Sequence, residues 1–191
     1  VDRKSYVFYP RTQGVPVNAT ANLFNRPYSI AADVEIPQGG AEGVLLSQGG
    51  NDGGYSLYIQ NGKLCHAYNY VGRNIYYVES AEAVSAGRHQ LRFEFEMTGK
   101  PDLPHGKGAP GKGQLYIDGK LVGQGDIPLT TPLTFGVVSY INCGADVGAP
   151  VTPKYKPPFP FSGKIYKVTV DVSGELIRDQ EAELRRHLAR Q

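Results

Sequence analysis

The sequence of 191 residues contains no tryptophan, one methionine and only two cysteines. Two cysteines do not make the disulfide framework of a small stapled domain, so we expect Cys65 and Cys143 to be buried free thiols, with a single disulfide as the alternative. No apolar run reaches the roughly 20 residues needed to span a bilayer, so no membrane partner is predicted. Lys and Arg total 20 against 18 Asp and Glu. This balance argues against nucleic acid as a partner.

Motifs for catalysis and metal binding are also missing. The four histidines show no metal-ligand spacing, and the glycine-rich segments lack the context of a phosphate-binding loop. Glu94 and Glu96 lie close together on one predicted strand, and some sandwich glycosidases place paired carboxylates in this way. Because Phe93 and Phe95 occupy the opposite face, we interpret both glutamates as solvated. The sequence thus predicts no catalytic residue, and no enzyme activity for this chain alone.

What the sequence does contain is antiparallel β-structure. Asn61-Gly62 and Asp118-Gly119 each interrupt an apolar/polar alternation, and these dipeptides favour the type I′ turn of a β-hairpin. Further strands are predicted over residues 28–36, 43–48, 88–97, 133–139 and 162–172. Hydrophobic residues make up 40% of the chain, which is enough for a globular core. The sequence predicts an all-β fold, an antiparallel two-sheet sandwich that forms a single domain over residues 1–191.

Two segments depart from this pattern. Residues 99–113 are rich in Gly, Pro and Lys, and only Leu103 offers an apolar anchor, so we expect a mobile and passive connector. After Ser173-Gly174 the apolar period changes, and residues 174–190 have an acidic start and a basic end. This pattern predicts one C-terminal helix. It docks either on the sandwich or on another domain.

The first hairpin brings together the residues that are our candidates for ligand or interface binding. A two-residue turn at Asn61-Gly62 pairs Leu57 with His66 and Tyr55 with Tyr68. Tyr55, His66, Tyr68 and Tyr70 then cluster at the end of the hairpin away from the turn. Such side chains suit sugars and protein interfaces, but they also fill cores with their polar tips at the edge. The absence of tryptophan weakens the sugar interpretation.

Two aspartates in glycine-rich loops are the candidate metal ligands. Asp52 lies in the segment NDGG and Asp146 in the segment GADVG. Oxygen ligands from such loops can hold calcium, although the spacing is not that of an EF-hand. The competing interpretation is that both are ordinary turn-forming aspartates and that the protein needs no cofactor.

A set of segments in a fixed order resembles a known family. The segments are VEIPQGGAEGVLLSQGG (34–50), GYSLYIQNGKL (54–64), YNY (68–70), GRHQLRFEF (87–95), LYIDGK (115–120), and residues 146–148 through PFPF (158–161) to GKIYKVTV (163–170). Together they resemble the C-terminal domain of a group of bacterial arylsulfatases. By extension the chain is similar to the concanavalin A/laminin G jelly roll. The resemblance covers residues 28–172.

The resemblance implies a role without chemistry. The family's nucleophile motif is Cys or Ser followed by x-Pro-Ser-Arg, whereas Cys65 precedes His-Ala-Tyr and Cys143 precedes Gly-Ala-Asp. The implied function is a non-catalytic accessory domain that packs on the catalytic sulfatase domain of the same polypeptide and shapes substrate access. The alternative is a lectin-like module that binds a carbohydrate or a sulfated substrate. Because the first residue is Val, we expect a piece of a longer protein.

Overall fold

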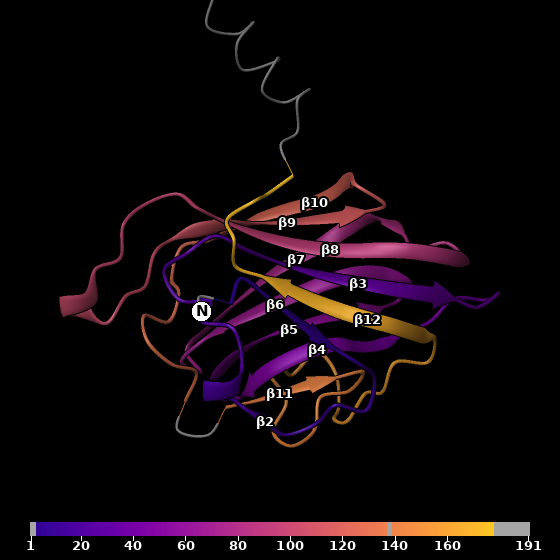
Figure 1. Cartoon of the computed structure of the whole chain (residues 1–191), viewed down its shortest axis with the longest axis horizontal. Helices are drawn as coiled ribbons and strands as arrows, with labels where there is room; N and C mark the ends of the chain where they lie inside the picture. Colours follow the sequence, from indigo (N-terminus) through magenta and orange to yellow (C-terminus); the bar gives the residue numbers. More distant parts are fainter. Residues whose placement is uncertain (1–2, 137–138, 178–191) are drawn as a thin grey trace, which may run out of the picture.

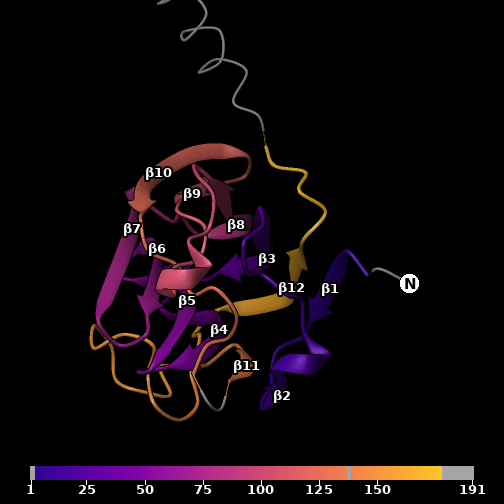
Figure 2. The same cartoon turned by 90° about the vertical axis from the view of Figure 1, so that its left-hand side faces the viewer.

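The structure, a computed structural model, describes residues 3–136 and 139–177, and it consists of two six-stranded antiparallel sheets packed face to face (Figures 1 and 2). Sheet A has the order β1-β12-β3-β8-β9-β10 and sheet B the order β2-β11-β4-β5-β6-β7. Two short 3₁₀ helices, η1 (Val17–Ala19) and η2 (Leu103–His105), lie in connections. No helix in the described part of the chain is long and apolar enough to cross a membrane. The strands are β1 (Ser5–Phe8), β2 (Val15–Pro16), β3 (Tyr28–Ile36), β4 (Gly43–Gly50), β5 (Gly53–Gln60), β6 (Lys63–Tyr70), β7 (Asn74–Ala83), β8 (Gly87–Met97), β9 (Gly111–Ile117), β10 (Lys120–Ile127), β11 (Tyr140–Cys143) and β12 (Lys164–Asp171).

Both predicted hairpins form with the expected turns. Asn61 and Gly62 have φ of 53° and 75°, and Asp118 and Gly119 have φ of 51° and 80°. Two consecutive residues with positive φ define the type I′ turn, whose twist matches that of the flanking strands. The register of β5 and β6 is the predicted one, with Leu57 opposite His66 and Tyr55 opposite Tyr68.

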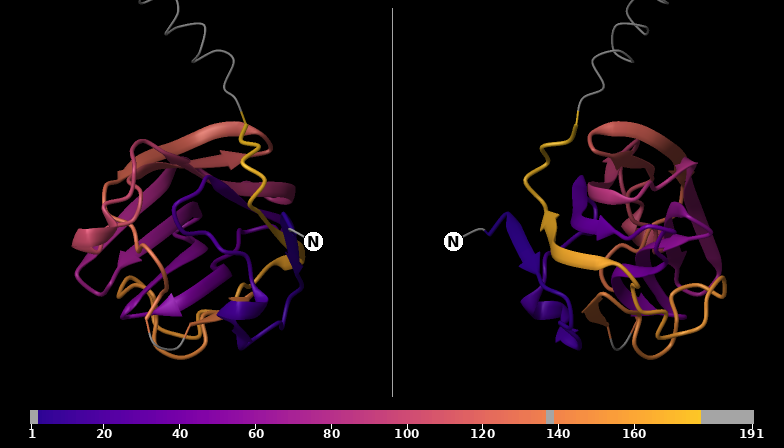
Figure 3. Two further views of the ribbon diagram at one scale, coloured as in Figure 1. Left: turned by 60° about the vertical axis from the view of Figure 1, so that its left-hand side comes forward. Right: turned by 90° about the vertical axis from the view of Figure 1, so that its right-hand side faces the viewer.

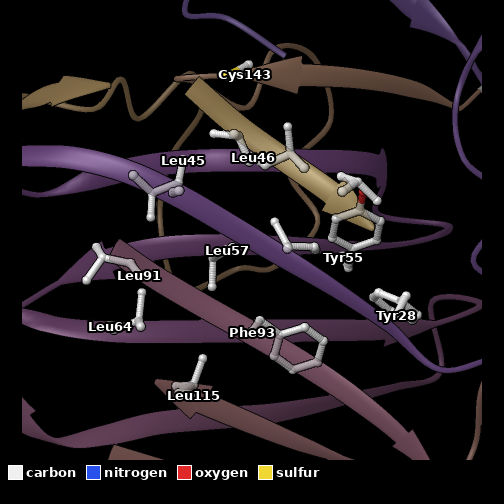
Figure 4. Packing of buried hydrophobic residues seen from close by; sticks show 14 of the residues in the cluster. Tyr28, Leu45, Leu46, Tyr55, Leu57, Leu64, Leu91, Phe93, Leu115 and Cys143 are labelled. Carbon is white, nitrogen blue, oxygen red and sulfur yellow. The ribbon is translucent and has the colours of Figure 1, made fainter. Parts of the chain in front are cut away.

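The core lies between the inner faces of the two sheets. Alternate residues of β3 and β8, such as Tyr28, Leu91 and Phe93, meet Leu46 and Leu57 from sheet B (Figure 4). These side chains are almost completely buried, and each such burial contributes about 1.5–3 kcal/mol relative to an exposed side chain. The alternating apolar patterns over 28–36 and 88–97 therefore correctly predict which side chains face the core.

Sheet B is covered on its outer face as well. Residues 144–163 form the long connection from β11 to β12, and Tyr155 in this connection packs edge-on against Tyr58 of β5, with 5.1 Å between the ring centroids. Val44, Cys65 and Ala67 complete this second apolar cluster. The strands β4, β5 and β6 are consequently buried on both faces. Their sequences are nearly continuous apolar or small-residue runs for this reason.

The predicted strand over 133–139 is wrong for the residues that the structure describes there, and the strand of this region, β11, begins only at Tyr140. Phe135 is fully buried instead. Its ring lies 4.9 Å from Phe24 and within 6 Å of Tyr55 and Tyr68 between centroids, where it closes one end of the core. The apolar pattern that predicted a strand here therefore reflects the burial of Phe135, which needs no pairing with a neighbouring strand. Residues 174–177 are not helical, and the remainder of the predicted helix lies outside the described residues.

The connector over 99–113 has more anchors than its sequence predicts. Leu103, the expected anchor, is 52% exposed, whereas Ala109 is fully buried. The Gly108 amide donates to the Thr130 carbonyl at 2.8 Å, and the Thr130 hydroxyl donates to the Ala109 carbonyl at 2.6 Å. The Ala109 amide donates to Asn25 Oδ1 at 2.9 Å. The prediction of a passive connector is therefore wrong for residues 108–110, because small residues there fit against a neighbouring loop.

Candidate functional site

The tyrosine and histidine cluster of the first hairpin lies mostly inside the core. Tyr55 and His66 are fully buried and Tyr68 is 3% exposed. The His66 ring stacks on Phe93 with 3.5 Å between centroids and an angle of 2°. The Tyr68 hydroxyl accepts a hydrogen bond from the Thr131 amide at 3.0 Å. These three side chains present no surface to a ligand. Tyr70 reaches the edge, where its hydroxyl donates to the Gly106 carbonyl at 3.0 Å.

The two candidate calcium ligands occupy different environments. Asp52 is exposed in the turn between β4 and β5, while Asp146 belongs to the connection of residues 144–163 and is fully buried. Asp146 Oδ2 accepts hydrogen bonds from the Tyr155 hydroxyl at 2.6 Å and the Val151 amide at 3.1 Å. Burial raises the pKa of this carboxyl above its usual value. Among residues 3–136 and 139–177, no three His, Cys, Asp or Glu side chains are grouped to hold a metal ion.

Both cysteines are buried free thiols, as expected from the sequence. Burial raises the pKa of Cys65 to about 11 and that of Cys143 to about 12. A thiol with so high a pKa carries almost no thiolate at neutral pH, which makes either cysteine a poor nucleophile.

The interpretation of Glu94 as a solvated side chain is wrong. It does lie on the outer face of sheet A, but it is completely buried. Residues 173–177, here called the strap, leave the end of β12 and run back over β8 (Figures 1 and 3). Glu94 Oε1 accepts a hydrogen bond from Arg92 Nε at 2.8 Å and another from the Ile177 amide at 2.7 Å. The alternation of β8 correctly predicts that Glu94 lies on the outer face of sheet A, but the strap covers that face at Glu94.

The strap and the outer face of sheet A enclose a groove of about 310 Å³, which we call the strap groove. Its lining comprises Ser29, Ala31 and Asp33 of β3, Gln90 and Arg92 of β8, Lys167, Thr169 and Asp171 of β12, and Ser173 and Glu175 of the strap. All but one of these side chains are polar. The strands β12, β3 and β8 are adjacent in sheet A, so they form a continuous floor.

Strand register explains why this face is hollow. Lys167, Asp33 and Gln90 lie opposite one another in one row across the three strands. Ala31 lies between Thr169 and Arg92 in the next row. The methyl group of Ala31 is shorter than the side chains around it on the three strands, so the surface is hollow at this position. Sequence reasoning missed this site, although the outward residues of each strand were recognisable, because strand order was unknown.

A second groove, of about 410 Å³, lies at the edge where the two sheets open, and we call it the edge groove. Arg11 and Gln13 line it from the segment after β1, and Phe161 from the segment before β12. It is more apolar in character, since Pro10, Pro160 and Ile165 also contribute. The strap groove differs from it in offering hydroxyl, amide, carboxylate and ammonium groups on one rigid sheet.

No protein-family model matches this chain, and no curated protein does. Solved structures do match. A structure of botulinum neurotoxin type C, whose cell entry is described as dependent on interaction with two ganglioside molecules, is 12% identical with a TM-score of 0.55 over 95% of this chain and 42% of that chain. The binding domain of botulinum neurotoxin serotype D is 10% identical with a TM-score of 0.52 over 98% and 44%. Domains LG4-5 of the mouse laminin alpha1 chain are 13% identical with a TM-score of 0.49 over 92% and 40%.

The two neurotoxin structures, with TM-scores above 0.5, support the fold. The chain is an antiparallel two-sheet jelly-roll sandwich, a fold like that of concanavalin A, as the sequence resemblance implied. It spans less than half the length of the two neurotoxin structures. At 10–12% identity with them, function does not follow from the fold. None of the comparisons connects the chain with a sulfatase.

Proposed function

We propose that this protein is a carbohydrate-binding, lectin-like module and that the strap groove is its binding site. The observation that carries the proposal is the polar lining of this groove on a rigid sheet face. Saccharides present many hydroxyl groups that both donate and accept hydrogen bonds. Carboxylates accept from them, ammonium groups donate to them, and Thr and Gln side chains do both. The volume of about 310 Å³ lies at the lower end of the range for small-ligand sites.

The fold similarities support this choice of ligand. The neurotoxin type C structure is described with ganglioside molecules, which are acidic glycolipids, so it supports a saccharide as the ligand but not the charge that this groove prefers. Because this chain matches less than half of that protein, the similarity does not locate a binding site. The proposed location rests on the strap groove alone. The sequence resemblance offered carbohydrate binding as the alternative to a structural role beside a sulfatase. The accessory role is compatible with the binding role, but the groove needs no sulfatase partner to bind a sugar.

We further propose that the chain binds its ligand without cleaving it. Of the two glutamates on β8, Glu94 is sealed beneath the strap by two hydrogen bonds and is inaccessible to a substrate. This removes the β8 glutamates as the two carboxyl groups that a glycosidase places on either side of the scissile bond. Incubation with a bound oligosaccharide should leave its length unchanged, and an aryl sulfate should also remain intact. Turnover that a point substitution in this chain abolishes would contradict this part of the proposal.

Binding can be tested with a glycan array and one space-filling substitution. Ala31→Leu places three additional carbons at the centre of the groove floor without changing any charge. We expect the wild-type protein to bind a subset of glycans and Ala31→Leu to lose that binding. The matched control is Ala81→Leu, the same change at an exposed position of β7. An array without any binding, or binding that both variants retain, would refute the strap groove as a sugar site.

A further inference from the structure

The strap groove carries more negative than positive charge. Its lining includes two cations, Arg92 and Lys167, and three carboxylates, Asp33, Asp171 and Glu175. Arg92 is already committed, because its Nε atom donates to the buried Glu94 at 2.8 Å and its Nη2 atom to the Glu175 carbonyl at 3.4 Å. Once Arg92 and Glu94 neutralise one another, a single ammonium group faces three carboxylates.

The two charged side chains at the centre of the groove, Lys167 and Asp33, do not pair with each other. Lys167 and Asp33 are cross-strand neighbours on β12 and β3. Within the described residues, however, no ion pair joins them, and no hydrogen bond from another side chain reaches the Asp33 carboxylate. Asp33 is half-buried, which reduces the screening of its charge by water. A ligand in the groove would therefore meet a carboxylate that has no side-chain partner among residues 3–136 and 139–177.

The carboxylate of Asp171 is held in place at the end of the groove. Asp171 Oδ1 accepts hydrogen bonds from the amide and the hydroxyl of Ser173, the first residue of the strap. These contacts fix the carboxylate and leave its charge uncompensated by any cation in the described part of the chain. Asp33 and Asp171 thus set a negative potential at both the middle and the end of the floor.

We infer that the strap groove selects amino-bearing or neutral saccharides and discriminates against sulfated or carboxylated ones. This inference rests on the proposed carbohydrate-binding function and specifies its ligand class. A protonated amino group gains a charge-assisted hydrogen bond at Asp33. A sulfate or carboxylate group meets like charges instead, and such juxtaposition opposes binding. The sulfated ligand that the sequence resemblance suggested is therefore the wrong class for this groove.

A matched series of β-1,4-linked tetrasaccharides tests the inference. Cellotetraose is neutral, chitosan tetraose carries protonated amines at pH 6, and sulfated cellotetraose is anionic. Titration of the full chain, followed by calorimetry or amide chemical shifts, should give the affinity order amine, neutral, sulfate. We expect steps of about twofold to fivefold, the effect of one partly exposed charge pair.

Two charge variants locate the effect. Asp33→Asn should reduce the amine-over-neutral preference, because the amine loses its charge-assisted hydrogen bond at Asp33 while Asp171 and Glu175 remain in the lining. Lys167→Gln should strengthen the preference, because, of the two cations that the described residues contribute to the groove lining, Lys167 is the one not paired with a carboxylate. Arg11→Gln in the edge groove is the control and should change neither ratio. Circular dichroism of each variant establishes that it is folded.

The outcomes separate the inference from the function on which it rests. If the sulfated tetrasaccharide binds tightest, the charge argument is overturned while carbohydrate binding stands. If Arg11→Gln abolishes that binding, the ligand lies in the edge groove and the inference for the strap groove is again overturned. If none of the tetrasaccharides binds and the glycan array is empty, the proposed function itself fails.

Discussion

His66 is a titratable side chain stacked between aromatic rings, and neither of its ring nitrogens has a hydrogen-bond partner in the described part of the chain. Protonation would place an unpaired charge in the core, so burial lowers its pKa from 6.5 to about 3. The unfolded chain therefore binds a proton at His66 between these two values while the folded chain does not. Folding stability from this residue is complete above pH 6.5 and declines as the pH falls towards 3.

His66→Leu should remove this pH dependence. One pKa unit corresponds to about 1.4 kcal/mol, so at pH 5 the wild type should lose roughly 2 kcal/mol through His66 relative to pH 7. Urea unfolding of both proteins at the two pH values measures the difference, and His105→Gln, at a side chain that is 74% exposed, is the control. Identical pH dependence of the wild type and His66→Leu would contradict the assignment.

Tyr155 and Asp146 form a buried polar contact within residues 144–163, the connection that covers the outer face of sheet B. The Tyr155 hydroxyl lies 2.6 Å from Asp146 Oδ2 and 2.8 Å from Ser56 Oγ. Tyr155→Phe should lower the free energy of unfolding by about 1–3 kcal/mol, because a buried carboxyl loses a donor. Tyr166→Phe, which removes a hydroxyl bonded to Glu35 at the surface, should change it by less than about 0.5 kcal/mol. Equal effects in thermal and urea unfolding would show that the buried contact adds nothing.

Among the elements, the connector between β8 and β9 illustrates how small residues produce order. A Cβ atom on Gly108 would lie 2.5 Å from the Thr130 hydroxyl oxygen and 2.8 Å from the Thr131 carbonyl oxygen. Gly108 therefore permits the close approach of two loops at one end of the sandwich. Sequence reasoning treated this glycine as a source of flexibility, because composition does not reveal which glycines touch another backbone.

Gly108→Ala should destabilise the protein by about 1–3 kcal/mol, the usual cost of overpacking. For a domain of this size that lowers Tm by roughly 2–4 °C per kcal/mol. Lys107→Ala changes the neighbouring exposed side chain and should leave Tm unchanged within error. Calorimetric scans of the two variants decide the matter, and an unchanged Tm for Gly108→Ala would restore the view of a passive connector.

The alternation of β3 and β8 and the turn residues at 61–62 and 118–119 were sufficient to predict strands, hairpins and one register. These features are local, so each is written in a few adjacent residues. The lateral order β12-β3-β8 joins segments more than 50 residues apart in the chain. No short pattern encodes that order, and for this reason neither the burial of Glu94 nor the hollow over Ala31 was predictable.

On the scale of the whole molecule, the two sheets differ in their access to water. The strands β4, β5 and β6 are covered by the core on one side and by residues 144–163 on the other. In sheet A, β12 faces the strap groove, and its outward residues Lys167, Thr169 and Asp171 are exposed or half-buried. The single core nevertheless joins both sheets, so we expect them to unfold together.

The covered outer face of sheet B has a consequence for amide hydrogen exchange. Exchange in β5 should require global unfolding, since water reaches neither of its faces, whereas β12 should exchange through smaller local openings. Native-state exchange followed by NMR should give β5 protection equal to the global stability, and β12 lower protection. A saccharide bound in the strap groove should slow exchange in β12 well before any change in β5. The protein thus keeps its slowest-exchanging amides in one sheet and its ligand-responsive amides in the other.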